Sequence, residues 1–413
     1  MRAKKKDLDR AFFGHPKPIF SLSLTEMWER FSFYSVRPLL ILFMSATMAS
    51  GGLGLDRENA GAIVGIFGGF LYLAALPGGY LADNYLGQKK AVFYGAIIIA
   101  LGHLCIALSI LYQGLFFLGL GFIVIGTGLF KTCVSVMVGL LYKKNDTRRD
   151  SGFTIFYMGI NVGAFIAILI TGLVAKTYGQ HLGFGIGGIG MLVSLIVFYF
   201  KTIKDFKEFE NEIGLEQEWD KPITKKKNLF FIIIAFALFV VVALLAINLF
   251  NLAPKDIARY MVTFILSCTF LYFLYLFFFI GLNIDERKNL IVFIILFLAS
   301  SLFWATFEQK PTSFNLFVQD FTSRDIFGWQ MPITWVQSLN PLFIIILAPF
   351  IGSFWIFLAS KNLGLSSITK FALGILGASI GYAIMMFAAR IVVASGGQTV
   401  SLWWLLQVSY FSH

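Results

Sequence analysis

The chain has 413 residues, of which 58% are apolar, 17% aromatic and only 13% charged. A soluble globular domain carries about a quarter charged residues, so this composition excludes a soluble protein. The net charge of +11 does not indicate nucleic-acid binding, because the basic residues are concentrated in every second loop between the apolar segments.

Apolar runs of roughly 20 residues recur along the chain, each long enough to cross a hydrocarbon core about 30 Å thick. Inside lipid the backbone must satisfy its own hydrogen bonds, so we expect these runs to be helices. The sequence predicts membrane helices near 19–47, 59–82, 90–111, 114–141, 153–174, 183–200, 229–250, 260–281, 288–309, 335–358 and 368–394, with one more beginning near 400.

The loops between these helices differ in their content of Lys and Arg. With the N-terminus inside, 23 Lys and Arg residues fall in inside segments and six in outside segments. This bias predicts a multi-pass protein of an inner membrane or plasma membrane with a cytoplasmic N-terminus. It also accounts for the positive charge, so the expected partner is the lipid bilayer and not nucleic acid.

A polar segment over 201–228 separates the first six predicted helices from the rest, and it is expected to link two bundles. Its first half is expected to form a charged helix on the membrane surface. The two helices that follow, 229–250 and 260–281, have no ionisable residue in their cores, so we expect them to face lipid.

Charged side chains remain inside the predicted membrane helices. Each costs about 2.5–3.5 kcal/mol at a helix centre on insertion scales, so we expect these residues to face inward and pair. Arg390, near an outer helix end, is expected to reach the surface instead. The others are Glu26, Glu29, Arg30, Arg37, Lys131 and Glu308.

Three of these charges share one face of the first helix, because Glu26, Arg30 and Arg37 stand at i, i+4 and i+11. Glu29 lies beside that face, and Lys131 is the expected partner for one glutamate. A carboxylate that is paired when charged and buried when neutral can switch with a proton. The alternative is a static ion pair, although buried ion pairs stabilise proteins poorly.

Glycines at four-residue spacing form a second pattern. They predict close helix approach, and ordinary packing is the simpler interpretation. The glycines are Gly61, Gly65 and Gly69, Gly159 and Gly163, and Gly377 and Gly381.

Four segments together resemble the proton-dependent oligopeptide transporters, a branch of the major facilitator superfamily. Residues 26–31, EMWERF, resemble the ExxER signature of that family. Residues 78–83 with Gly87 and Lys90, residues 153–163 and residues 337–341 resemble further family segments. The resemblance runs from about His15 to the end of the chain.

The resemblance implies an all-α polytopic membrane protein with the major facilitator superfamily fold, built from two six-helix bundles and two extra linker helices. The N-terminal bundle would cover 1–200, the cytoplasmic linker with the two extra helices 201–285, and a partial C-terminal bundle 286–413. The implied function is a proton-coupled symporter that imports di- and tripeptides by alternating access. We expect a monomer, no enzymatic activity, no metal, and no cofactor besides the proton as coupling ion.

The resemblance also implies residue roles. Glu26, Glu29, Arg30 and Lys131 would form the proton-coupling group, and Glu308 would pair with Arg37 in an outer gate. Phe33 departs from the family, because many members have Tyr at this position. The implied substrate-binding residues are Tyr34, Arg37, Tyr72, Lys131, Asn161 and Trp304.

Three alternatives remain. A family member could carry another substrate, such as nitrate or a drug. A membrane enzyme would need a spaced set of catalytic groups, and His15, His103, His181 and His413 form none with acids or cysteines. A truncated, non-transporting protein is the third. From Ser401 to His413 a helix covers about 20 Å, short of a core of about 30 Å, so we expect the natural chain to continue into a glutamate-bearing helix.

Overall fold

The computed structural model describes residues 7–143, 145–213, 220, 222 and 252–411. The backbone forms two compact units, Met1–Phe43 with Phe67–Ala246 and Met44–Ile66 with Ile247–His413. In the part of the chain that the structure describes, nine helices are long and apolar enough to cross a membrane. The all-α prediction is therefore confirmed, while the predicted domain limits remain a prediction.

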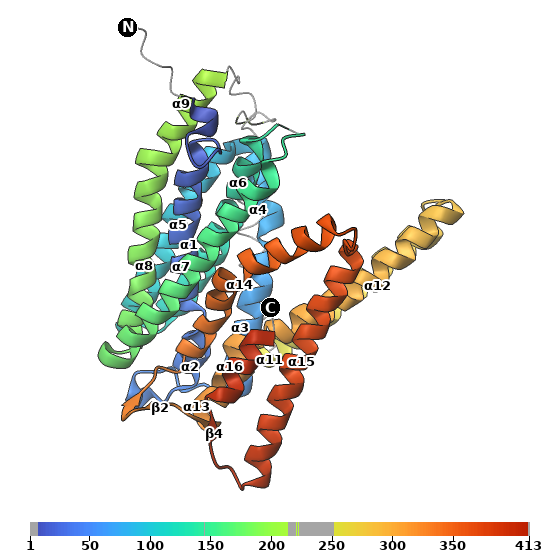
Figure 1. Ribbon diagram of the computed structural model, residues 1–413. Coiled ribbons are helices and arrows are strands. Elements are labelled where there is room, and N and C mark those ends of the chain that lie inside the picture. Colours follow the sequence, from blue (N-terminus) through green and yellow to red (C-terminus); the bar gives the residue numbers. More distant parts are fainter. Residues whose placement is uncertain (1–6, 144, 214–219, 221, 223–251, 412–413) are drawn as a thin grey trace. The chain divides into compact units, whose positions relative to one another are not determined.

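The helices from α1 to α9 lie close to the predicted positions. Helices α2 and α3 each include residues of both units. Helix α1 packs against α7 and α8, and α5 packs against α6 and α8, so that α1, α5, α6, α7 and α8 form a bundle (Figure 1). The bounds are α1 Pro18–Val36, α2 Leu40–Ser45, α3 Arg57–Leu73, α4 Ala75–Leu81, α5 Gln88–Ala107, α6 Gly114–Leu140, α7 Arg149–Tyr178, α8 Gln180–Val197 and α9 Ile203–Ile213, with short helical turns η1 Leu8–Arg10, η3 Ala82–Leu86, η4 Leu108–Ile110 and η5 Phe198–Thr202.

Two predicted helices are interrupted, and each interruption has a proline nearby. The helix predicted over 19–47 ends at Val36, and α2 begins at Leu40, because Pro38 lacks an amide hydrogen and restricts the residue before it. The helix predicted over 59–82 breaks after Leu73, the residue whose carbonyl would have accepted from the missing amide of Pro77.

The second unit contains the predicted C-terminal helices and short strands that the sequence did not predict. Strand β1 pairs in parallel with β4, and β2 pairs with β3 antiparallel. The predicted helix 229–250 lies outside the described residues. The bounds are η2 Met48–Ser50, α11 Pro254–Phe278, α12 Ile284–Phe307, η8 Lys310–Phe314, α13 Asn315–Phe321, β1 Thr322–Ser323, β2 Asp325–Ile326, β3 Trp329–Gln330, α14 Trp335–Ser360, α15 Ser367–Ala394, β4 Val400–Ser401 and α16 Trp403–Phe411.

Close approach of α1 and α7 depends on the glycine pair at 159 and 163. A Cβ added to Gly159 would lie 3.0 Å from the Ser23 carbonyl oxygen, and one added to Gly163 would collide with the Met27 carbonyl oxygen. The predicted role of this pair in helix packing is confirmed. In contrast, apart from the backbone of the same helix and the adjacent residues, no atom of the described residues lies within 4 Å of a Cβ added to Gly61 or Gly65.

Candidate functional site

The charged residues of α1 form a buried group. The Arg30 guanidinium Nε lies 3.1 Å from Glu26 Oε1 and also pairs with the Glu29 carboxylate. Glu26 is 3% exposed, Glu29 1% and Arg30 5%. Helical spacing brings them together, because residues three and four apart share a face and Glu29 adjoins Arg30 directly. Burial of such charges is tolerated only because they are paired.

This group has one more acid than base, and its hydrogen bonding is incomplete. In the described part of the chain, neither Glu26 Oε2 nor Arg30 Nη2 has a hydrogen-bond partner. Buried polar atoms without a protein partner are uncommon, and they occur at functional sites and beside bound water. Addition of one proton would remove the excess negative charge of Glu26, Glu29 and Arg30.

The aromatic ring of Phe33 contacts two guanidinium groups. Its centre is 4.9 Å from Arg30 Cζ and 5.8 Å from Arg37 Cζ. The face of an aromatic ring attracts cations, so Phe33 links the paired Arg30 to the predicted substrate-binding Arg37. Tyr34, another predicted substrate residue, meets the Phe33 ring edge-on with centroids 5.2 Å apart.

Lys131, the predicted partner of a glutamate, lies outside this ion-paired group. Its ammonium nitrogen is 5.1 Å from the centre of the Tyr72 ring. Across the described residues, no ion pair joins Lys131 to Glu26 or Glu29, so the expected pairing is absent from this conformation. The structure instead brings together Tyr72, at the end of α3, and Lys131, on α6, which are both predicted substrate-binding residues.

The remaining predicted residues differ in their surroundings. Asn161 is buried on α7, where its Nδ2 donates to the Tyr157 carbonyl oxygen at 2.9 Å. Trp304 and Glu308 belong to the second unit. The Trp304 side chain is half exposed on α12, and the Glu308 amide, at the end of that helix, donates to the Trp304 carbonyl oxygen. The predicted Glu308–Arg37 pair remains a prediction.

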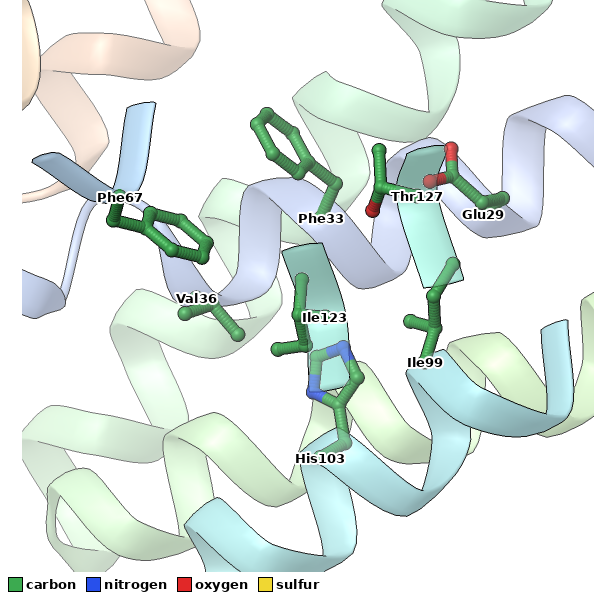
Figure 2. Close-up of a pocket in the computed structure, with 8 residues that line it drawn as sticks. All are labelled: Glu29, Phe33, Val36, Phe67, Ile99, His103, Ile123 and Thr127. Carbon is green, nitrogen blue, oxygen red and sulfur yellow. The ribbon is translucent and has the colours of Figure 1, made fainter. Parts of the chain in front are cut away.

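A small cavity adjoins the charged group of α1, and sequence reasoning missed it. Figure 2 shows the Glu29 carboxylate and the Thr127 hydroxyl on one side of it and the His103 ring on another. The isolated histidine of α5 was the only signal in the sequence. The lining residues are Glu29, Phe33, Val36, Phe67, Ile99, His103, Ile123 and Thr127.

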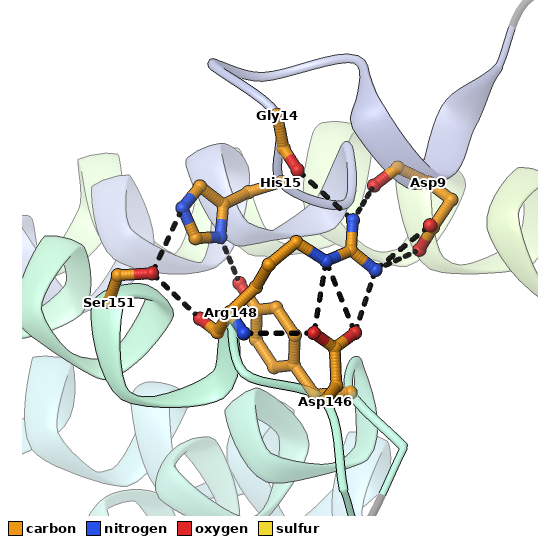
Figure 3. A network of polar contacts seen from close by, with 7 residues as sticks. Asp9, Gly14, His15, Asp146, Arg148 and Ser151 are labelled. Atoms are coloured by element: carbon orange, nitrogen blue, oxygen red, sulfur yellow. Dashed lines mark hydrogen bonds and ion pairs between the residues drawn. The ribbon is translucent and has the colours of Figure 1, made fainter.

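A polar network fixes the segment before α1 to the turn between α6 and α7 (Figure 3). Arg148 Nη2 donates to Asp9 at 2.9 Å and to Asp146 at 2.7 Å, and Nη1 donates to the Asp9 and Gly14 carbonyl oxygens. The hydrogen bonds from Arg148 lower the pKa of Asp146 to about 2. This network orders the chain that leads into α1.

His15 belongs to the same network. Its Nδ1 lies 2.9 Å from the Tyr142 hydroxyl, and Ser151 Oγ lies 3.4 Å from its Nε2. Burial lowers the pKa of His15, and the nearby Arg148 lowers it further.

Comparison with known proteins places the chain in a group of transporters. The sequence profile of the POT family matches residues 89–412. The chain is 54% identical over 400 residues to the peptide transporter YePEPT of Yersinia enterocolitica, covering 96% of this chain and 78% of that protein. It is 35% identical over 409 residues to a di-/tripeptide transporter of Lactococcus lactis subsp. cremoris, covering 96% and 80%.

Solved structures agree with the sequence comparison. The crystal structure of a peptide transporter POT in complex with sulfate matches with a TM-score of 0.84 and 37% identity, over 97% of this chain and 80% of that one. A POT family transporter in complex with a thioalcohol-conjugated peptide matches with a TM-score of 0.84 and 30% identity, over 98% and 82%.

Proposed function

The chain belongs to the POT family, and we propose that it is a proton-coupled symporter that imports di- and tripeptides by alternating access. Relatives named as peptide and di-/tripeptide transporters support the substrate class. The single structural observation that carries the coupling is the buried group of Glu26, Glu29 and Arg30.

The charge balance of this group supports proton coupling. When both carboxylates are ionised, Arg30 is shared between them and one negative charge remains in excess. Protonation of one carboxylate removes that excess and weakens its hold on Arg30. The guanidinium is then free to reorient, which would connect proton binding to movement of α1.

Peptide recognition is assigned to the cations beside this group. Arg37 and Lys131 would attract the peptide carboxylate, and Phe33 and Tyr72 hold these cations against aromatic faces. Tyr34 and Asn161 would contact the peptide backbone, and Trp304 would line a side-chain pocket. Recognition of termini and backbone would accept many side chains, since every dipeptide carries the same termini.

The proposed location is the cytoplasmic membrane, with the N-terminus inside. The Lys and Arg distribution of the loops supports this orientation. The network around Arg148 would then lie on the cytoplasmic side. We propose that the transporter acts as a monomer.

The test is dipeptide uptake by the purified protein in liposomes. An inward proton gradient should drive accumulation of dipeptide above its outside concentration, and a protonophore should abolish that accumulation. Nitrate in place of the dipeptide serves as the alternative substrate. A folded protein that accumulates no di- or tripeptide under a proton gradient would overturn the proposal.

A further inference from the structure

Helix α1 is held by buried polar contacts on both sides of its charged group. Before that group, Ser194 Oγ donates to the Thr25 carbonyl oxygen at 2.7 Å, and the Thr25 and Thr202 hydroxyls lie 2.9 Å apart. After it, the Ser32 hydroxyl lies 2.6 Å from His103 Nε2 on α5. All of these side chains are buried, so water does not compete for these bonds.

The contact between Ser32 and His103 ties two helices together. Serine in a helix often bonds a carbonyl of its own preceding turn, as Ser35 does with the Phe31 carbonyl oxygen at 2.7 Å. Ser32 instead bonds to the imidazole of the neighbouring helix. His103 is 1% exposed, and such a ring is costly to bury without a hydrogen bond.

Glycines of α8 make room for this imidazole. A Cβ added to Gly187 would lie 2.7 Å from His103 Nδ1, and one added to Gly188 would lie 3.2 Å from His103 Cβ. Among the described residues His103 Nδ1 has no hydrogen-bond partner, so the contact of Nε2 with the Ser32 hydroxyl is what satisfies this buried ring.

The contact also lies on the face of α1 that carries Glu29. Ser32 follows Glu29 by three residues, and Phe33 and Val36 continue the same face at i+4 and i+7. Glu29, Phe33, Val36 and His103 line one cavity (Figure 2). A rotation of α1 that broke the Ser32 bond would therefore also turn the Glu29 carboxylate away from the cavity.

We propose that His103 is a positioning residue for proton coupling: through Ser32 it fixes the rotation of α1 that keeps Glu29 facing the cavity. This inference rests on the proposed function, because it assigns a role within the same site. It differs from simple packing, since the imidazole acts through one hydrogen bond to the helix that carries the coupled carboxylate.

The test compares two transport modes of the same protein in liposomes. One is dipeptide accumulation driven by a proton gradient; the other is exchange of labelled for unlabelled dipeptide without a gradient. Loss of one buried hydrogen bond should lower gradient-driven accumulation about tenfold in His103→Leu and in Ser32→Ala. Exchange should stay within about twofold of wild type in both variants, because exchange does not require proton release.

Three further variants sharpen the test. His103→Gln can accept from Ser32 through its amide oxygen and should recover part of the accumulation. The double variant should be no worse than His103→Leu alone, because both changes remove one shared bond. His181→Gln is the matched control: His181 Nδ1 lies 3.3 Å from the Ser109 hydroxyl in the same unit but does not line the cavity, so both modes should be unchanged.

The outcomes separate this inference from the proposed function. Wild-type exchange of dipeptides establishes peptide transport whatever His103 does. If His103→Leu and Ser32→Ala both keep the wild-type ratio of accumulation to exchange, the positioning role is overturned. If His103→Leu does not assemble, Ser32→Ala decides the question alone. A wild-type protein that moves no dipeptide in either mode would overturn both statements.

Discussion

The Lys131 ammonium lies over the ring of Tyr72, 5.1 Å from its centre, and this contact joins α6 to the end of α3. Lys131 therefore has an aromatic neighbour in this conformation, where we had expected a glutamate of α1 as its partner. An ammonium held by a ring face keeps its charge available to an incoming anion.

The ring of Tyr72, more than its hydroxyl, should matter for peptide affinity. Tyr72→Phe keeps the aromatic face and should change the apparent dipeptide affinity by less than about twofold, whereas Tyr72→Leu should weaken it about two- to fivefold. The measurement is the dipeptide concentration that gives half-maximal exchange in liposomes. Equal losses in the Phe and Leu variants would show that the hydroxyl is the important group.

Free dipeptides should compete better than C-terminally amidated ones. A carboxylate bonded by Arg37 and Lys131 is worth about 1.5–3 kcal/mol over a neutral group, which is a preference of roughly 10- to 150-fold. Competition against a labelled dipeptide measures this preference, and Lys131→Gln should reduce it. Equal competition by the acid and amide forms of one dipeptide would refute the assignment of these two cations.

Gly163 should be intolerant of even a methyl group. An added Cβ would collide with the Met27 carbonyl oxygen, so Gly163→Ala must separate α1 from α7 and should cost about 1–3 kcal/mol of stability. The thermal unfolding midpoint in detergent should fall by several degrees. The matched control is Gly121→Ala on α6, where no described atom lies within 4 Å of an added Cβ. An unchanged midpoint in Gly163→Ala would contradict the close approach.

His15 should make stability depend on pH. Burial and the nearby Arg148 lower its pKa in the folded protein below the ordinary 6.5. The folded state then binds fewer protons than the unfolded state, so this contribution is complete above pH 6.5 and is lost as pH falls through the lowered pKa. The thermal midpoint of wild type should therefore fall more between pH 8 and pH 5 than that of His15→Gln. Parallel pH profiles in the two proteins would contradict this contribution.

The spacing of residues along the sequence predicted much of the site, because the ion-paired residues of the site belong to one helix. Glu26, Glu29 and Arg30 pair as their separation along α1 requires. Arg37 also continues this helix, since it directly follows Val36 in helical conformation and its amide donates to the Phe33 carbonyl oxygen at 3.3 Å, before Pro38 ends the regular helix.

Contacts between helices were harder to predict. The spacing of Gly159 and Gly163 predicted a close approach, which is confirmed. The sequence could not tell that Lys131 meets Tyr72 and not a glutamate, since that depends on the relative rotation of the helices. The contacts of His103 could not be predicted for the same reason. They require α1, α5 and α8 to meet at one point, and no regular spacing of residues in the sequence indicates such a meeting.

The most direct test of proton coupling measures protons and not peptide. Liposomes containing the protein and an internal pH-sensitive dye are given a dipeptide outside, without an initial pH gradient. Wild type should acidify the interior as the dipeptide enters, because each peptide is accompanied by protons carried on Glu26 or Glu29. Glu29→Gln and Glu26→Gln should lose this acidification while still exchanging labelled dipeptide. Dipeptide entry without acidification in wild type, or full acidification in both Gln variants, would contradict the assignment of the coupled proton to this buried group.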